Sequence, residues 1–378
     1  MWLVAGALGL LAVLTGWLPG GAAREVAVTR AGPVLAFLVG ITVLAELADA
    51  AGVFDAAAGV CARAGGGSAR RLFLLVAALG TLTTIGMSLD TTAVLLTPVV
   101  LTLAARLGLR PLPFAFLVVW LAGTASLLLP VSNLTNLLAV QHLGASTGTL
   151  AFAGRMALPE VVAVIVTVAY LGLWFRRDLT GGYDTPAPTV PADRLLFRVC
   201  AAACLALVPG VLLGAPPWTV AVPAAAVCAL AFAVRRRREL RPGLVPWRLL
   251  VLTEGLFIAV TALDRHGLGD LLAHAAGTGT LRTAGVGVVS SNVVNNLPAY
   301  LAVEPAVAPG HTTQLLGLLL GTDAGPLITL WGSLATLLWR QRCTARGVRI
   351  SPWLFARVGL LGVPLVLVAS WAALRVTG

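Results

Sequence analysis

The chain has 378 residues, of which 58% are apolar and 11% are charged, and its mean hydropathy is +0.95. This composition excludes an ordinary soluble domain and indicates an integral membrane protein. The formal charge of +11 comes from Arg residues in short runs between apolar segments, which is typical of membrane topology and argues against a nucleic-acid partner.

Membrane-crossing helices are predicted wherever an apolar run is long enough to span a bilayer. Nine runs meet this condition, near residues 1–19, 33–50, 113–141, 152–175, 195–213, 217–234, 247–263, 314–339 and 351–375. Two of them, 113–141 and 314–339, are interrupted by a small polar cluster. Matched interruptions in the two halves of a chain point to the substrate site of a secondary transporter.

Two further apolar segments carry polar residues at their centres. The segment 72–105 has its polar centre at 87–92, and the segment 283–303 has its centre at 290–298. We interpret both as re-entrant hairpins with polar tips, because irregular backbone at membrane depth needs protein or water around it. Two short spans over 72–105 would leave the loops on the same sides, so that alternative stays open.

The Arg residues predict how the loops are sorted between the two sides of the membrane. With the N-terminus in the cytoplasm, most of the 26 Arg residues fall in cytoplasmic loops. The same scheme predicts an all-α polytopic membrane protein with a single transmembrane domain over 1–378. It contains two inverted repeats, each with a re-entrant hairpin and a broken transmembrane helix. The repeats cover about 1–176 and 217–378, and helix 195–213 links them.

Residues that recur at a constant interval support the repeat. Asp49, Gly52 and Asp55 correspond in spacing to Asp264, Gly267 and Asp270, and Pro98 corresponds to Pro298. Aspartate and proline are uncommon inside membrane segments, so these matches carry more weight than matched leucines.

Polar residues at the hairpin tips and helix breaks are the candidate substrate and ion ligands. Their neutral donors and acceptors suit a small polyhydroxy solute or a cation, and half-helix N-termini would also favour an anion. In a purely structural alternative they would cement helix packing. The candidates are Ser88, Asp90, Thr91, Thr92, Ser132, Asn133, Thr135, Asn136, Ser291, Asn292, Asn295, Asn296, Asp323, Ser333 and Thr336.

Two of these candidates, Asp90 and Asp323, are acids and could couple transport to protons. A carboxyl group at membrane depth is usually functional, and desolvation favours its protonated form. Alternatively, each acid accepts hydrogen bonds from free N–H groups at a helix end and never titrates. Glu46 and Glu254 are weaker functional candidates. Glu160 follows Pro159 near the start of a span, and we interpret it as structural.

Four motifs in order along the chain resemble the ArsB-type arsenite permeases of the ion transporter, citrate transporter-like superfamily. They are 90–98, 125–136, 295–298 and 332–339, the last preceded by Asp323-Ala-Gly-Pro. The resemblance covers nearly the whole chain and implies export of arsenite or antimonite, in exchange for protons or beside a separate ATPase. It also implies elevator-like movement and homodimers. The family usually has Asn where this chain has Leu89.

The sequence therefore predicts a secondary transporter of the cell membrane and no enzyme, because no Walker-type Gly-Lys loop, nucleophile–base pair or metal-ligand spacing is found. We expect no resident cofactor; the coupling ion is H⁺ or Na⁺. The leading hypothesis is proton-coupled efflux of arsenite or antimonite as the neutral trihydroxide. The alternatives are sodium-coupled symport of a small organic or inorganic anion, sodium/proton antiport, and a channel or scaffold. The expected partners are a small solute, the lipid bilayer, a second copy and an ATPase subunit.

Overall fold

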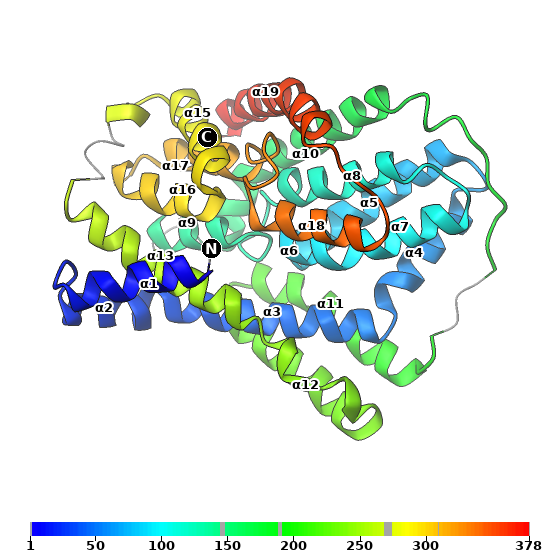
Figure 1. Cartoon of the computed structure of the whole chain (residues 1–378), viewed down its shortest axis with the longest axis horizontal. Coiled ribbons are helices and arrows are strands. Elements are labelled where there is room, and N and C mark those ends of the chain that lie inside the picture. Colours follow the sequence, from blue (N-terminus) through cyan, green and yellow to red (C-terminus); the bar gives the residue numbers. More distant parts are fainter. Residues whose placement is uncertain (1, 144–147, 188–190, 268–273, 309, 378) are drawn as a thin grey trace.

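The computed structural model describes residues 2–143, 148–187, 191–267, 274–308 and 310–377. These residues form helices joined by turns (Figure 1), and eight helical segments among them are long and apolar enough to cross a membrane. The prediction of an all-α polytopic membrane protein is confirmed. The inverted repeats and their boundaries stay predictions.

Apart from the first two crossings, the helices of the first half begin and end close to the predicted runs. They are α1 (Trp2–Leu14), α2 (Gly20–Glu25), the π-helical turn η1 (Val26–Ala31), α3 (Gly32–Ala50), α4 (Val53–Ala64), α5 (Ala69–Gly86), α6 (Leu89–Thr91), the π-helical turn η2 (Thr92–Leu96), α7 (Thr97–Arg106), α8 (Pro111–Thr124), α9 (Leu134–Leu143) and α10 (Thr149–Trp174).

The helices of the second half also lie close to the predicted runs. They are α11 (Arg194–Leu212), α12 (Pro217–Arg235), the 3₁₀ turns η3 (Arg237–Glu239) and η4 (Pro242–Leu244), α13 (Trp247–Asp264), α15 (Thr280–Val294), α16 (Asn296–Val303), the 3₁₀ turn η5 (Glu304–Ala306), α17 (Thr312–Asp323), α18 (Leu334–Ala345) and α19 (Pro352–Thr377).

The first predicted crossing, 1–19, is shorter than expected. Helix α1 has 13 residues and is therefore about 20 Å long, less than the roughly 30 Å of a hydrocarbon core. It ends because Gly16 takes a φ of +77° and Leu18 N–H donates to Ala12 O at 2.9 Å, which turns the chain away from the helix axis. The next crossing is longer than predicted, because α2, η1 and α3 form one helical run over 20–50.

Both broken helices occur where the sequence predicts them. The chain leaves the helix between α8 and α9, at 125–133, and between α17 and α18, at 324–333. We call these two segments the first break and the second break. Each half-helix is too short to cross a bilayer alone, so each pair together makes one crossing.

Both predicted hairpins turn back at their polar centres. The first turns at Met87 and Ser88, between α5 and α6, and the second turns at Asn295, between α15 and α16. The first hairpin starts and finishes at one place, since Ser68 pairs with Gly182 and Arg110 forms an ion pair with nearby Asp178. Its two arms therefore begin and end on the same face of the protein.

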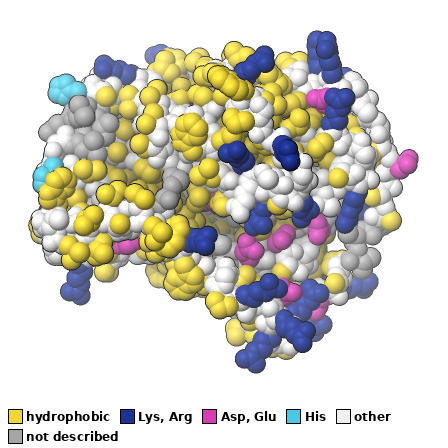
Figure 2. All heavy atoms as spheres, in the orientation of Figure 1, with side chains coloured by type: hydrophobic (Ala, Val, Ile, Leu, Met, Phe, Trp, Pro, Cys, Tyr) yellow, Lys and Arg dark blue, Asp and Glu magenta, His cyan; other side chains and the backbone are white. Residues whose placement is uncertain are grey.

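Loops that the charge pattern assigns to one side contact one another. Arg235 Nε lies 2.6 Å from Asp193 Oδ2, Arg236 donates to Ala50 O at 3.4 Å, and Arg346 bonds Thr102. Together with 65–68, 107–110, 175–187 and 191–193 these loops form what we call the arginine-rich face. Most long helices run from left to right in Figure 1, and Figure 2 shows Arg side chains gathered at the right and lower right.

The repeat markers lie at similar places where the structure describes them. Gly52 follows α3 and Gly267 follows α13, and both take a positive φ, of 82° and 93°. Asp270, a third marker of the second repeat, lies outside the described residues. The repeat itself stays a prediction.

Candidate functional site

Each hairpin tip contacts one helix break, so the irregular segments form two pairs of a tip and a break. Leu89 N–H, at the first tip, donates to Ser132 O in the first break at 2.9 Å, and the Ser132 hydroxyl donates to Ile85 O at 3.0 Å. Asn295 Nδ2, at the second tip, donates to Trp331 O in the second break at 3.0 Å. These bonds satisfy backbone groups that lipid could not.

A small cavity of about 40 Å³ lies where the tips and breaks meet. Its polar lining consists of Asp90 from the first hairpin, Asn133 from the first break, and Asn295 and Asn296 from the second hairpin. No Arg, Lys or His is among the described residues that line it. We call this space the tip cavity. Its charge is set by one carboxylate among three amides.

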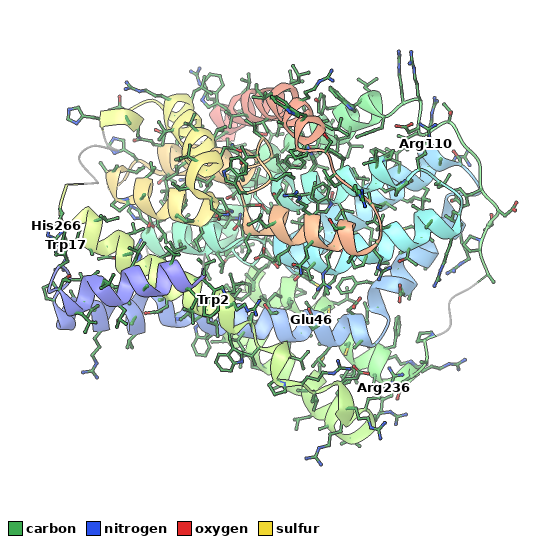
Figure 3. All side chains as sticks on the ribbon, viewed as in Figure 1. Trp2, Trp17, Glu46, Arg110, Arg236 and His266 are labelled. Carbon is green, nitrogen blue, oxygen red and sulfur yellow. The ribbon has the colours of Figure 1, made fainter. Side chains whose placement is uncertain are left out.

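A larger cavity of about 580 Å³ connects this region to the arginine-rich face. Ser88, Asp90 and Asn295 line it near the hairpin tips, and Arg248 and Arg342 line it toward the arginine-rich face. We call it the inner cavity. Most of its wall is apolar, and the lining residues come mainly from α3, from α6 and η2, from the segment 243–246 with the start of α13, and from α18. Glu46 on α3 and Trp2 at the start of α1 both lie beside it (Figure 3).

Asp90 is open to both cavities. It lines the tip cavity and the inner cavity, and none of the described residues forms a hydrogen bond or an ion pair with its carboxylate. A carboxylate that protein groups leave unbonded at membrane depth is available to water, a proton, a cation or a solute. Asp90 therefore has the geometry of a binding group.

Asp323 occupies a different environment. Its side chain is 1% exposed, and its Oδ1 accepts hydrogen bonds from Thr135 Oγ1 at 2.8 Å and from Thr322 Oγ1 at 3.4 Å. It lines neither the tip cavity nor the inner cavity. The Thr135 bond ties the start of α9 to the end of α17, so Asp323 joins the two breaks.

Two of the candidate hydroxyls, those of Ser88 and Ser333, cap helix starts, and two more, those of Thr91 and Thr336, bond to them. Ser88 Oγ accepts from Thr91 N–H at 3.2 Å, and Ser333 Oγ accepts from Thr336 N–H at 3.0 Å. In each pair the two hydroxyls also bond each other, at 3.0 and 2.8 Å. The same Ser-x-x-Thr cap thus starts α6 and α18, although Ser88 and Thr91 also line the inner cavity.

Two asparagines hold the backbone of the breaks. Asn136 Nδ2 donates to Ser126 O at 2.6 Å and to Leu129 O at 3.0 Å. Asn292 Nδ2 donates to Gly325 O, and its Oδ1 accepts from Thr329 N–H, both at 2.9 Å. The structure therefore places both amides against backbone and away from the described cavities.

The remaining candidates face other protein groups. Thr92 Oγ1 lies 2.9 Å from Thr84 Oγ1 inside the first hairpin. Ser291 is buried on α15, lines no described cavity, and its hydroxyl is unbonded among the described residues. Glu160 is 2% exposed and accepts from Leu127 N–H at 2.7 Å, so it holds the first break.

Sequence reasoning missed part of the inner cavity wall. Thr42 lines the cavity from α3, and Arg342 lines it from α18, although its sequence position suggested only a loop charge. A signal was present, because Leu334, Leu338 and Arg342 recur at intervals of four and so share one face of a helix.

Comparisons with known proteins match this architecture. The family model described as "Citrate transporter" matches residues 1–321. An arsenical pump membrane protein of Yersinia enterocolitica is 30% identical over 369 residues, which cover 90% of this chain and 85% of that protein. The arsenical pump membrane protein of Escherichia coli (strain K12) is 28% identical with the same coverage.

One further sequence relative and one solved structure are also similar to the chain. An uncharacterized transporter of Mycobacterium tuberculosis (strain ATCC 25618 / H37Rv) is 27% identical over 374 residues, covering 90% of this chain and 86% of that protein. The crystal structure of the Alcanivorax borkumensis YdaH transporter, described as having an unusual topology, matches with a TM-score of 0.58 and 17% identity. The match covers 95% of this chain and 89% of that one, and shows a shared fold.

Proposed function

Because the chain belongs to the citrate transporter family and is related over most of its length to arsenical pump membrane proteins, we propose that it exports trivalent arsenic or antimony. It is a multi-pass membrane transporter. The proposed substrate form is the neutral trihydroxide, and the proposed driving reaction is exchange for protons.

The tip cavity is the observation that carries this proposal. Its polar lining is one carboxylate and three amides, without a cationic side chain among the described lining residues. A trihydroxide can donate hydrogen bonds to Asp90 and to amide oxygens, and can accept them from amide N–H groups. A carboxylate substrate would instead meet Asp90 with no positive partner, which is unfavourable at low dielectric.

Asp90 also offers a route for proton coupling. Its carboxylate lies at the inner end of a cavity that opens toward the arginine-rich face, so water in the cavity can exchange a proton with it. We propose that Asp90 binds either a proton or the substrate, and that this competition produces the exchange. Asp323 then serves mainly to join the breaks, because its Oδ1 is bonded to Thr135.

A second candidate is sodium-coupled symport of a small anion, or sodium/proton antiport. The matching family is described by citrate transport, and a carboxylate with amide oxygens is also a suitable set of oxygen ligands for a cation. In that reading Asp90 would hold sodium. Transport that depends on a sodium gradient would favour it over proton exchange.

The cellular arrangement is part of the proposal. The arginine-rich face lies in the cytoplasm by the positive-inside rule, which places the N-terminus there in the cell membrane and opens the inner cavity to cytoplasmic substrate. A separate ATPase subunit would dock on this face, where Arg237 and Arg238 are exposed. Homodimerisation rests on the resemblance to the superfamily.

The proposal can be tested in an arsenite-sensitive bacterial strain. Cells that express the chain should contain less arsenite than cells with an empty vector, and Asp90→Asn should abolish this difference. Leu360→Ala is a matched control, because Leu360 is 58% exposed on α19 and should leave export unchanged. Equal arsenite contents with and without the wild-type chain, at verified membrane levels, would refute arsenite export.

A further inference from the structure

A third cavity approaches the site from the opposite face of the protein. It has a volume of about 910 Å³ and is lined by Thr29 and Arg30, by Gln141 and His142 at the end of α9, and by Glu304 after α16. We call it the outer cavity. The inner and outer cavities thus lie on opposite sides of the region where tips and breaks meet.

Two small spaces lie between the inner and outer cavities, along the contact between α13 and α16, which we call the seam. The tip cavity is bordered there by Leu256 and Leu297. One helical turn farther along the seam, a second space of about 40 Å³ is lined by Val260, Leu301 and Arg30. Arg30 also lines the outer cavity, so its side chain stands between the seam and that cavity.

An ion pair fixes Arg30 in this position. Its guanidinium bonds Glu304, whose side chain is 1% exposed, whereas that of Arg30 is 37% exposed. His142 Nδ1 lies 3.4 Å from the other Glu304 oxygen, and Arg30 lies 5.8 Å from the centre of the Phe257 ring. The groups come from four separate elements: η1, α9, η5 and α13.

The ion pair connects η1 to the end of the second hairpin. Arg30 lies in η1, a π-helical turn within the long run of α2 and α3, and such turns occur often at functional positions. Glu304 directly follows α16, the second arm of the hairpin whose tip borders the tip cavity. Any movement of this hairpin away from η1 must separate the two charges.

We propose that the Arg30–Glu304 pair is the gate on the outer side of the transport path. In the conformation described here the inner cavity reaches Asp90, whereas the ion pair closes the seam toward the outer cavity. A buried carboxylate without its partner is strongly unfavourable. The gate therefore opens by moving both charges into the water of the outer cavity, where they separate at little electrostatic cost.

Cysteine labelling tests the gate without reference to any substrate. Leu301→Cys places a thiol in the seam, where Leu301 is 2% exposed, and a membrane-impermeant maleimide is applied to intact cells. With the ion pair intact, labelling should be slow. Combining Leu301→Cys with Arg30→Gln or Glu304→Gln should raise the labelling rate about tenfold, because loss of the pair shifts the population toward the outward-open state.

Three controls define the outcome. The protein without the added cysteine gives the background of its five native cysteines. Gln141→Cys, at an exposed position of the outer cavity, reports which side of the membrane that cavity faces. If the maleimide does not label this cysteine in intact cells, the labelling is done on everted vesicles instead. The charge exchange Arg30→Glu with Glu304→Arg should restore slow labelling.

The gate is overturned if both single variants label Leu301→Cys at the rate of the intact pair. Arg30→Lys keeps the charge and should label slowly, which separates loss of the pair from general disruption. Because labelling needs only a membrane transporter of this fold, its result is independent of whether arsenite is the substrate.

Discussion

Thr135 donates a hydrogen bond of 2.8 Å to Asp323, and this bond joins the helix after the first break to the helix before the second. The two residues are 188 positions apart in the sequence, and both are buried. This side-chain contact therefore links the two interrupted helices.

Removing the Thr135 hydroxyl should destabilise the protein. Thr135→Val leaves Asp323 buried with one hydrogen-bond donor fewer, which costs about 1–3 kcal/mol. Thr135→Ser keeps the hydroxyl and is the matched control. Thermal unfolding of the purified proteins in detergent should give a lower midpoint for the valine variant. Equal midpoints for the two variants would show that the bond contributes nothing.

Replacing Asp90 should affect transport and leave stability almost unchanged. Its carboxylate forms no hydrogen bond with the described residues, so Asp90→Asn removes a charge without breaking a structural contact. We expect the transport rate to fall on the order of tenfold or more, with the unfolding midpoint kept. A variant that transports at the wild-type rate would remove Asp90 from the mechanism.

Close packing of the second hairpin against α17 should tolerate no methyl group at Gly321. A Cβ at Gly321 on α17 would lie 2.9 Å from the carbonyl carbon of Ala284 on α15. A Cβ at Gly285, next to Ala284 on α15, meets nothing within 4 Å. Gly321→Ala should therefore lower the yield and the unfolding midpoint, since the two backbones must move apart. Gly285→Ala should match or slightly exceed wild type. Equal behaviour of the two variants would contradict this packing.

Acid should weaken the start of α11. The Arg235 hydrogen bond, aided by N–H groups of Leu195 and Leu196, holds the pKa of Asp193 below its ordinary value. A lowered folded-state pKa stabilises the fold at pH values above the unfolded-state pKa, about 3.9, and this contribution is lost as the pH falls through the folded-state pKa.

The measurement for Asp193 is the unfolding midpoint between about pH 6 and pH 3. Wild type should be more stable than Asp193→Asn at the upper end, and the two curves should converge at the lower end. A constant difference across the range would assign the effect of Asp193 to neutral capping of α11.

Much of the fold could be predicted because a bilayer imposes long apolar helices and makes interruptions conspicuous. The breaks and the hairpin tips, near Ser88 and Asn295, lie where polar residues interrupt apolar runs. The extent of α1 could not be read in this way, because Gly16 ends the helix although the apolar run continues.

The separate roles of the site residues could not be predicted from their types. Asn136 and Asn133 look equivalent in the sequence, yet the first bonds the backbone of its own break and the second lines the tip cavity. Likewise Asp90 and Asp323 differ only once Thr135, distant in the sequence, is placed beside one of them. Such distinctions arise from contacts between the two halves of the chain.

The most direct test of the proposed function is arsenite accumulation in everted membrane vesicles that contain the protein. Radiolabelled arsenite is measured with an imposed proton gradient, and then with a sodium gradient in its place. We predict accumulation that depends on the proton gradient and collapses with a protonophore. No arsenite movement under either gradient, with the protein present in the membrane, would contradict the proposed function and favour sodium-coupled transport of an anion.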